Sequence, residues 1–126
     1  MKFTPIDPPR EFETGFASCP VVMRDCGRLV LEPDEQVTLV TPSGAEYDVA
    51  RKAWGFYATP SLNGRLSQFG LRGVLVKNRI GRYFILLVET EREDDFEEYL
   101  AAEGITIVWW LDRTEELERL EKKLNG

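Results

Sequence analysis

Histidine is absent from this chain of 126 residues, and its absence narrows the chemistry open to the protein. Ser-His-Asp and Cys-His catalytic arrangements need an imidazole, and imidazole is also the commonest metal ligand. Any catalysis would therefore depend on a carboxylate, lysine, tyrosine or cysteine with a shifted pKa. The carboxylates that we consider as general bases are Asp25, Asp48 and Asp112, and their spacing fits turn and capping roles equally well. The sequence thus leaves open whether the protein is an enzyme.

Cysteine is scarce too, since the chain contains only Cys19 and Cys26. Two thiols without a histidine cannot complete a four-ligand zinc site, and their spacing is not the CxxC of a redox motif. We expect two reduced structural cysteines, because disulfides are rare in cytosolic proteins. The sequence predicts no metal ion and no other cofactor.

Long apolar runs are also missing. The longest, Tyr83–Val88, is far shorter than the ~20 residues that a helix needs to cross a bilayer. Residues 1–16 carry several prolines and acids and lack the apolar core of a secretory signal. We therefore expect a cytoplasmic protein that does not bind membranes.

Acidic residues are missing from the whole segment Val49–Val88, although the chain has 22 of them and a net charge of −6. The bases of this segment are Arg51, Lys52, Arg65, Arg72, Lys77, Arg79 and Arg82. Bringing like charges together on folding is costly unless opposite charges lie nearby. We therefore expect the segment to bind an anionic ligand, or to contact acidic parts of this chain or of a partner.

The composition, with 43% apolar and 30% charged residues, fits a globular protein, and no linker or repeat divides residues 1–126. We expect one α+β domain, with an N-terminal β-meander followed by a β-hairpin, a helix, a strand and a C-terminal helix around one mixed sheet. Residues 1–20 form an extended, proline-rich arm. The next strands are expected at Arg28–Leu31, Val37–Thr41, Glu46–Ala50 and Lys52–Ala58, followed by an ordered loop over Thr59–Gly70.

The second half of the chain has clearer patterns. Leu71–Lys77 and Tyr83–Glu89 are expected to form the hairpin. Thr90-Glu91-Arg92-Glu93 has the pattern of a capping box and predicts a helix that buries Phe96, Tyr99 and Leu100 and ends at Gly104. The apolar run Ile105–Leu111 predicts a buried strand that follows a right-handed crossover and pairs in parallel, with Tyr83–Val88 at the centre of the sheet. A last helix is expected over Arg113–Leu124.

The densest candidate site runs from Trp54 to Leu66 and gathers aromatic rings, small polar side chains, two glycines and an arginine. Glycines let backbone amides approach an anion, and a guanidinium binds phosphate or carboxylate bidentately. The ligand-binding residues that we predict here are Arg51, Lys52, Trp54, Tyr57, Thr59, Ser61, Asn63 and Arg65. The competing interpretation is a loop whose aromatic residues complete the core. The chain contains neither a P-loop nor a G-x-G-x-x-G pattern.

Two other binding patterns carry less weight. Bases interleaved with aromatic residues suit single-stranded nucleic acid, but a pI near 4.8 argues against that partner. The acidic run Glu93–Glu98 lacks the ligand spacing and glycine of a calcium loop. We interpret this run as a solvated helix face or as the counter-charge of the basic segment.

The leading functional hypothesis is a small, non-catalytic accessory protein, bacterial in character, that recognises an anionic ligand or an acidic partner surface. It requires Arg65 to be partly exposed beside Tyr57. The alternatives are a small enzyme acting on a phosphorylated or nucleotide-linked substrate, and a structural homodimer. We expect self-association because Trp109 and Trp110 point to opposite faces of a strand, so that one is left for the last helix or for a partner to cover.

Overall fold

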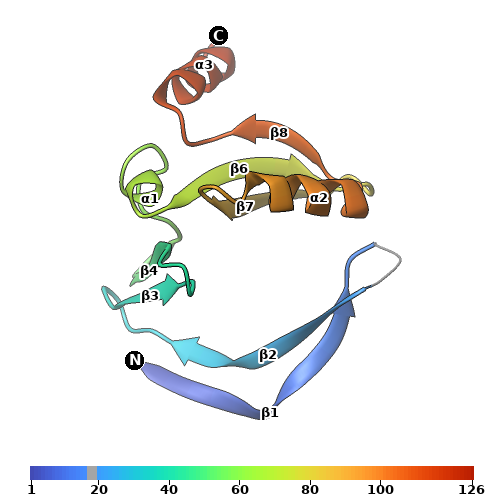
Figure 1. Cartoon of the computed structure of the whole chain (residues 1–126). Coiled ribbons are helices and arrows are strands. Elements are labelled where there is room, and N and C mark those ends of the chain that lie inside the picture. The colour runs from blue at the N-terminus through green and yellow to red at the C-terminus, as the bar shows by residue number, and fades with distance from the viewer. Residues whose placement is uncertain (17–19) are drawn as a thin grey trace.

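The computed structural model describes residues 1–16 and 20–126, which contain eight strands and three helices arranged as in Figure 1. The combination of strands and helices confirms the α+β class expected from the sequence. The single mixed sheet was wrong, because the strands form three separate sheets in which every pairing is antiparallel. Within the described residues, no helix is both long and apolar enough to span a membrane. Cys19 lies outside the described residues, and Cys26 is an exposed free thiol.

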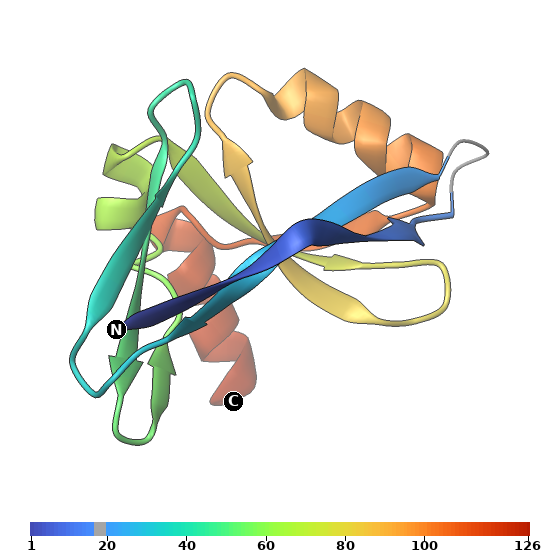
Figure 2. The same ribbon diagram turned by 90° about the horizontal axis from the view of Figure 1, so that it is seen from below.

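The first sheet is a two-stranded ribbon of β1 (Lys2–Thr14) and β2 (Val21–Val30), paired antiparallel. The N-terminal segment is extended, as expected, but it is a paired strand and not a single arm. The register shifts between Pro5 and Arg10, where extra β1 residues bulge out of the ladder. The ribbon lies below the other sheets in Figure 1, and in Figure 2, which is seen from below, it crosses diagonally in front of them.

The second sheet contains β3 (Gln36–Val40), β4 (Glu46–Lys52) and β5 (Gly55–Tyr57) in that order, all antiparallel. The turn between β3 and β4 holds Gly44 at φ 97°, a conformation that favours glycine. After β5 the chain forms a single helical turn, α1 (Arg65–Gln68), inside the segment that we expected to be a loop.

The third sheet has the order β7-β6-β8, with β6 (Leu71–Lys77) between β7 (Tyr83–Glu89) and β8 (Thr106–Trp110). Both partners pair antiparallel with β6, so the expected parallel pairing and the central position of Tyr83–Val88 were wrong. The sequence misled because the apolar run Tyr83–Val88 suggested burial on both faces, whereas Tyr83, Phe84 and Ile85 are exposed at the edge of the sheet. Acids of the same chain neutralise Arg72 of β6, and β6 is buried on both faces.

Helix α2 (Glu93–Glu103) ends at Gly104, which has φ 68°, as predicted. The predicted capping box was wrong, because Glu91 adopts φ 73° and the N-cap position falls on Arg92 with no side-chain hydrogen bond. Leu100 is buried and Phe96 half-buried as expected, but Tyr99 is exposed.

Helix α3 (Thr114–Leu124) has no buried residue, and its N-cap is Arg113 without a side-chain hydrogen bond, so Asp112 and Glu115 do not form a capping pair. The helix covers Trp109, whose indole Nε1 donates to the Glu116 carbonyl at 3.0 Å. The guanidinium of Arg119 lies over the same ring. Trp110 packs edge-on against Phe96. Both tryptophans are half-buried and line a cavity of about 530 Å³, so self-association through this pair stays a prediction.

Two small apolar clusters connect the second sheet, the third sheet, α1 and α2. Leu66, fully buried, packs between Ala45, which precedes β4, and Leu71 of the third sheet. Val74, Val76 and Val88 form the other cluster under α2. Both clusters contain residues of β6, so this strand connects the two parts of the core.

Candidate functional site

Arg65 lies at the rim of a cavity of about 290 Å³ on the second sheet. The cavity is lined by Gln36, Asp48, Ala50, Tyr57, Pro60, Ser61 and Arg65. These residues come from β3, β4, β5, the segment between β5 and α1, and the first residue of α1, so the site is assembled from one half of the chain.

Hydrogen bonds from backbone amides fix the position of the Arg65 main chain at the start of α1. The Ser61 hydroxyl accepts the Arg65 amide at 2.8 Å, and the Ser61 carbonyl accepts the Leu66 amide at 3.1 Å. The Leu66 side chain is fully buried, which anchors the helical turn to the core. Arg65, its neighbour, must therefore project toward the surface beside β4.

The Arg65 guanidinium is held in place on two sides. Its Nε donates to Asp48 Oδ2 at 2.8 Å, and its Cζ lies 4.3 Å from the centre of the Phe69 ring. Half of the side chain is still exposed, at 50%. Within residues 1–16 and 20–126, the two terminal nitrogens donate to no protein acceptor, so their hydrogens are open to a ligand.

Asp48 is the carboxylate that orients the arginine. It accepts from Arg65 and, at 2.8 Å, from the Thr38 hydroxyl on the neighbouring strand. Both hydrogen bonds, that of Arg65 first, lower the pKa of Asp48 below its usual value. A carboxylate that stays ionised and paired is a weak proton acceptor near neutral pH, so this arrangement suits binding better than general base catalysis.

The predicted site residues divide into two groups. Tyr57, Ser61 and Arg65 line the cavity. The others lie elsewhere: Arg51 donates to the Lys52 carbonyl, Lys52 pairs with Asp34 at 2.6 Å, Asn63 donates to the Thr114 hydroxyl at 3.1 Å, Trp54 is exposed and Thr59 is half-buried. The candidate site is therefore smaller than the sequence predicted.

Sequence reasoning missed Gln36, Ala50 and Pro60 as lining residues and did not place Asp48 beside Arg65. The register of the predicted hairpin could have shown part of this. Pairing Val37–Thr41 with Glu46–Ala50 around a short turn puts Thr38 opposite Asp48, as the structure has it. The approach of Arg65 to that pair is a tertiary contact that no local pattern reveals.

Within the described residues, three of the seven bases of the segment form ion pairs with acids of the same chain: Lys52 with Asp34, Arg65 with Asp48, and Arg72 with Asp112 and Glu93. Arg72 Nε donates to Asp112 Oδ2 at 2.7 Å, and its guanidinium lies 3.7 Å from a Glu93 oxygen. Arg79 donates to the carbonyls of Ala102 and Glu103 at the end of α2. Of the acidic run on α2, Glu93 reaches a base of the segment. The second expectation of the sequence, contact with acidic parts of the same chain, therefore accounts for Arg72, whereas Arg79 contacts backbone carbonyls.

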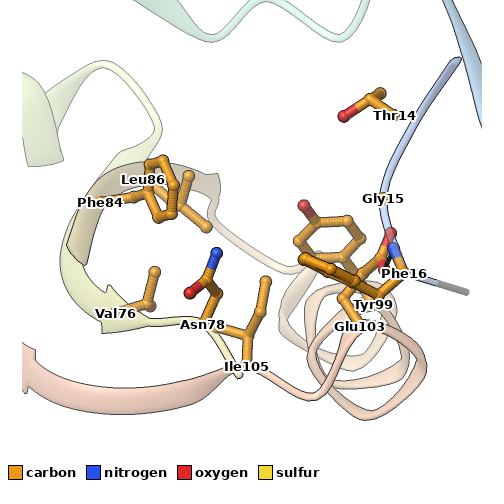
Figure 3. A pocket seen from close by; sticks show the side chains of 10 residues that line it. All are labelled: Thr14, Gly15, Phe16, Val76, Asn78, Phe84, Leu86, Tyr99, Glu103 and Ile105. Atoms are coloured by element: carbon orange, nitrogen blue, oxygen red, sulfur yellow. Dashed lines mark hydrogen bonds between the residues drawn. The ribbon is translucent and has the colours of Figure 1, made fainter. Parts of the chain in front are cut away.

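A second cavity, of about 210 Å³, lies where the end of the ribbon meets the third sheet (Figure 3). Its walls are mostly apolar and include Phe84, Leu86 and Ile105. Glu103 is buried at its edge, and its carboxylate accepts the backbone amide of Phe16. This hydrogen bond holds the end of the ribbon against α2 at the edge of the cavity.

Comparisons with known proteins add no function to these sites. No protein-family model matches the chain, and neither the curated proteins nor the solved structures provide a match. In the part of the chain that the structure describes, no group of three or more acids and cysteines is arranged to hold a metal ion.

Proposed function

We propose that this protein is a non-catalytic binding protein that recognises a carboxylate or phosphate group through Arg65. The observation that carries the proposal is a half-exposed guanidinium, fixed by Asp48 and Phe69, at the rim of a cavity. A guanidinium already held in one orientation loses little freedom when it binds an anion bidentately. Tyr57 and Ser61 supply apolar cover and a hydroxyl beside it.

The charge of the site favours a small anion. Asp48 offsets the charge of Arg65, so the pair attracts a distant anion only weakly. Binding then depends on direct hydrogen bonds from the guanidinium to the anion. The anionic group is a carboxylate or phosphate on a small molecule or an acidic side chain of a partner protein. The accessory role and the cytoplasmic location expected from the sequence are part of this proposal.

The enzyme alternative is less well supported. It requires a titratable group poised near neutral pH in the cavity, and the cavity carboxylate, Asp48, has a lowered pKa. The homodimer alternative concerns other surfaces and is compatible with anion binding.

Calorimetric titration with inorganic phosphate and, separately, with acetate tests the proposal. We expect R65Q to weaken binding of the preferred anion by about tenfold or more, because the bidentate hydrogen bonds are lost. R82Q is the matched control, because Arg82 belongs to the same basic segment but does not line the cavity. D48N should strengthen binding, since it removes the competing negative charge.

Either of two results would overturn the proposal: equal affinity of R65Q and the wild type, or equal losses of affinity in R65Q and R82Q. Unchanged affinity in D48N would show that the charge of Asp48 does not compete with the anion. A preference for phosphate over acetate, or the reverse, identifies the class of anion. Amide chemical shifts that move at Ser61–Leu66 on titration would locate the anion at the predicted cavity.

A further inference from the structure

The molecule exposes much more surface than a compact monomer of its size. Its accessible area is 9184 Å² for a mass of 14.5 kDa. A compact monomer of that mass exposes roughly 6,900 Å², so the excess is about 2,300 Å². A standard protein interface buries roughly 800 Å² on each partner, and obligate dimers bury more. The excess is therefore large enough for an extensive interface between two copies.

The ribbon of β1 and β2 holds a large share of the uncovered apolar side chains. Residues opposite one another in an antiparallel pair share a face, and faces alternate along a strand. One face thus contains the cross-strand pairs Phe12–Met23 and Phe3–Leu29, with the Arg10–Asp25 ion pair between them. Phe3 is 55% exposed and Met23 is 45% exposed. The other face carries Glu11–Arg24 and Thr4–Arg28 and is mainly polar.

The rest of the chain supports this ribbon mainly at its ends. At one end the amino group of Met1 bonds a Glu35 carboxylate oxygen at 2.9 Å, and at the other the Phe16 amide bonds Glu103. A two-stranded ribbon is marginally stable in water unless a further layer covers its apolar face. The exposure of Phe3 and Met23 shows that residues 1–16 and 20–126 do not supply such a layer over that face.

We propose that a second copy of this chain covers the apolar face of the ribbon, in a two-fold dimer. The face is self-complementary, with an apolar pair at each end and an ion pair in the middle. An antiparallel two-fold contact sets the Phe12–Met23 end of one copy over the Phe3–Leu29 end of the other. The two Arg10–Asp25 pairs then meet near the axis in opposite orientations. Such an isologous contact closes on itself and leaves no free apolar face.

This surface differs from the one that the sequence suggested, since Trp109 is already covered by α3. It is also separate from the Arg65 cavity, so the dimer and the anion site can fail independently. The length of the ribbon makes the contact extensive: Met23 and Leu29 are six positions apart on β2, about 20 Å along an extended strand.

Multi-angle light scattering at micromolar concentration tests the dimer, with a mass twice 14.5 kDa expected for the wild type. M23K places a charge in the apolar face and should shift the mass to that of one chain. V22K is the matched control, because Val22 is a neighbouring residue of the same strand but lies on the opposite face. It should stay dimeric. Circular dichroism of both variants shows whether the substituted chains still fold.

If M23K fails to fold, the milder M23T and L29T variants should weaken the dimer, which would be measured as a rise of tenfold or more in its dissociation constant. A wild-type mass of one chain overturns the proposal. A dimer that V22K dissociates and folded M23K does not would overturn the assignment of the face.

Discussion

Arg72 on β6 donates from Nε to Asp112 Oδ2 at 2.7 Å and lies with its guanidinium carbon 4.0 Å above the ring of Trp110. The carboxylate belongs to the segment between β8 and α3, so this contact fixes the start of the last helix against the central strand. The Asp112 hydrogen bond, followed by the nearby charges, raises the pKa of Arg72 above its usual value. Both side chains are largely buried, at 20% and 11% exposure.

We expect R72A to lower the free energy of unfolding by about 2 kcal/mol, because it leaves a mostly buried carboxylate without its charged donor. Urea denaturation measures the change. The matched control is R92A, which removes a similar arginine–carboxylate pair, with Asp95, on the exposed surface. Its unfolding midpoint should stay near that of the wild type, since solvent screens exposed pairs. Equal losses in the two variants would show that burial of the Arg72 pair has no energetic weight.

Leu66 is the residue that joins the second and third sheets, and it is fully buried. L66A should lower the free energy of unfolding by about 3 kcal/mol, from lost apolar contact and the cavity left behind. L124A is the control, since Leu124 at the end of α3 is 76% exposed. Thermal and urea unfolding should separate the two variants clearly. A small effect of L66A would mean that the two sheets do not depend on this contact.

Glu103 holds the end of the ribbon through the Phe16 amide. E103A should speed hydrogen exchange at the amides of Thr14–Phe16, because the acceptor that protects the Phe16 amide is removed. E98A, an exposed glutamate on the same helix, serves as the control and should leave the exchange of those amides unchanged. Exchange followed by mass spectrometry distinguishes a local release of the ribbon from global unfolding. Unchanged protection in E103A would contradict the role given to this contact.

Stability should fall in acid partly through Glu89. The hydroxyls of Ser43 and Thr41, in that order, lower its pKa and link the β3–β4 turn to β7. A carboxyl with a lowered pKa in the folded state contributes stability above its unfolded-state pKa, and the contribution is lost as pH falls through the folded-state pKa. E89Q should therefore flatten the fall of stability with pH below the usual glutamate range. E91Q is the control and should keep the pH dependence of the wild type. An equally steep fall of stability with pH in E89Q and the wild type would refute the effect.

Part of this protein could be read from local patterns. The alternating and apolar runs that predicted Val37–Thr41, Leu71–Lys77 and Tyr83–Glu89 coincide closely with β3, β6 and β7. The end of α2 at Gly104 was also predictable, because glycine reaches positive φ without steric cost. Local backbone preference and side-chain periodicity determine these features, and both are properties of short sequence windows.

The tertiary structure decided the features that join distant segments. After the crossover that follows β7, β8 could pair with either β6 or β7. It pairs with β6, and in this position Val74, Trp110 and Phe96 pack in one cluster. The basic segment looked like a ligand site because its counter-charges, Asp34 and Asp112, lie far away in the sequence. Arg65 remained half-exposed because Leu66 turns inward and Asp48 takes a single nitrogen of its guanidinium. Charge and periodicity are set along the chain, whereas pairing, burial and neutralisation depend on which segments meet in space.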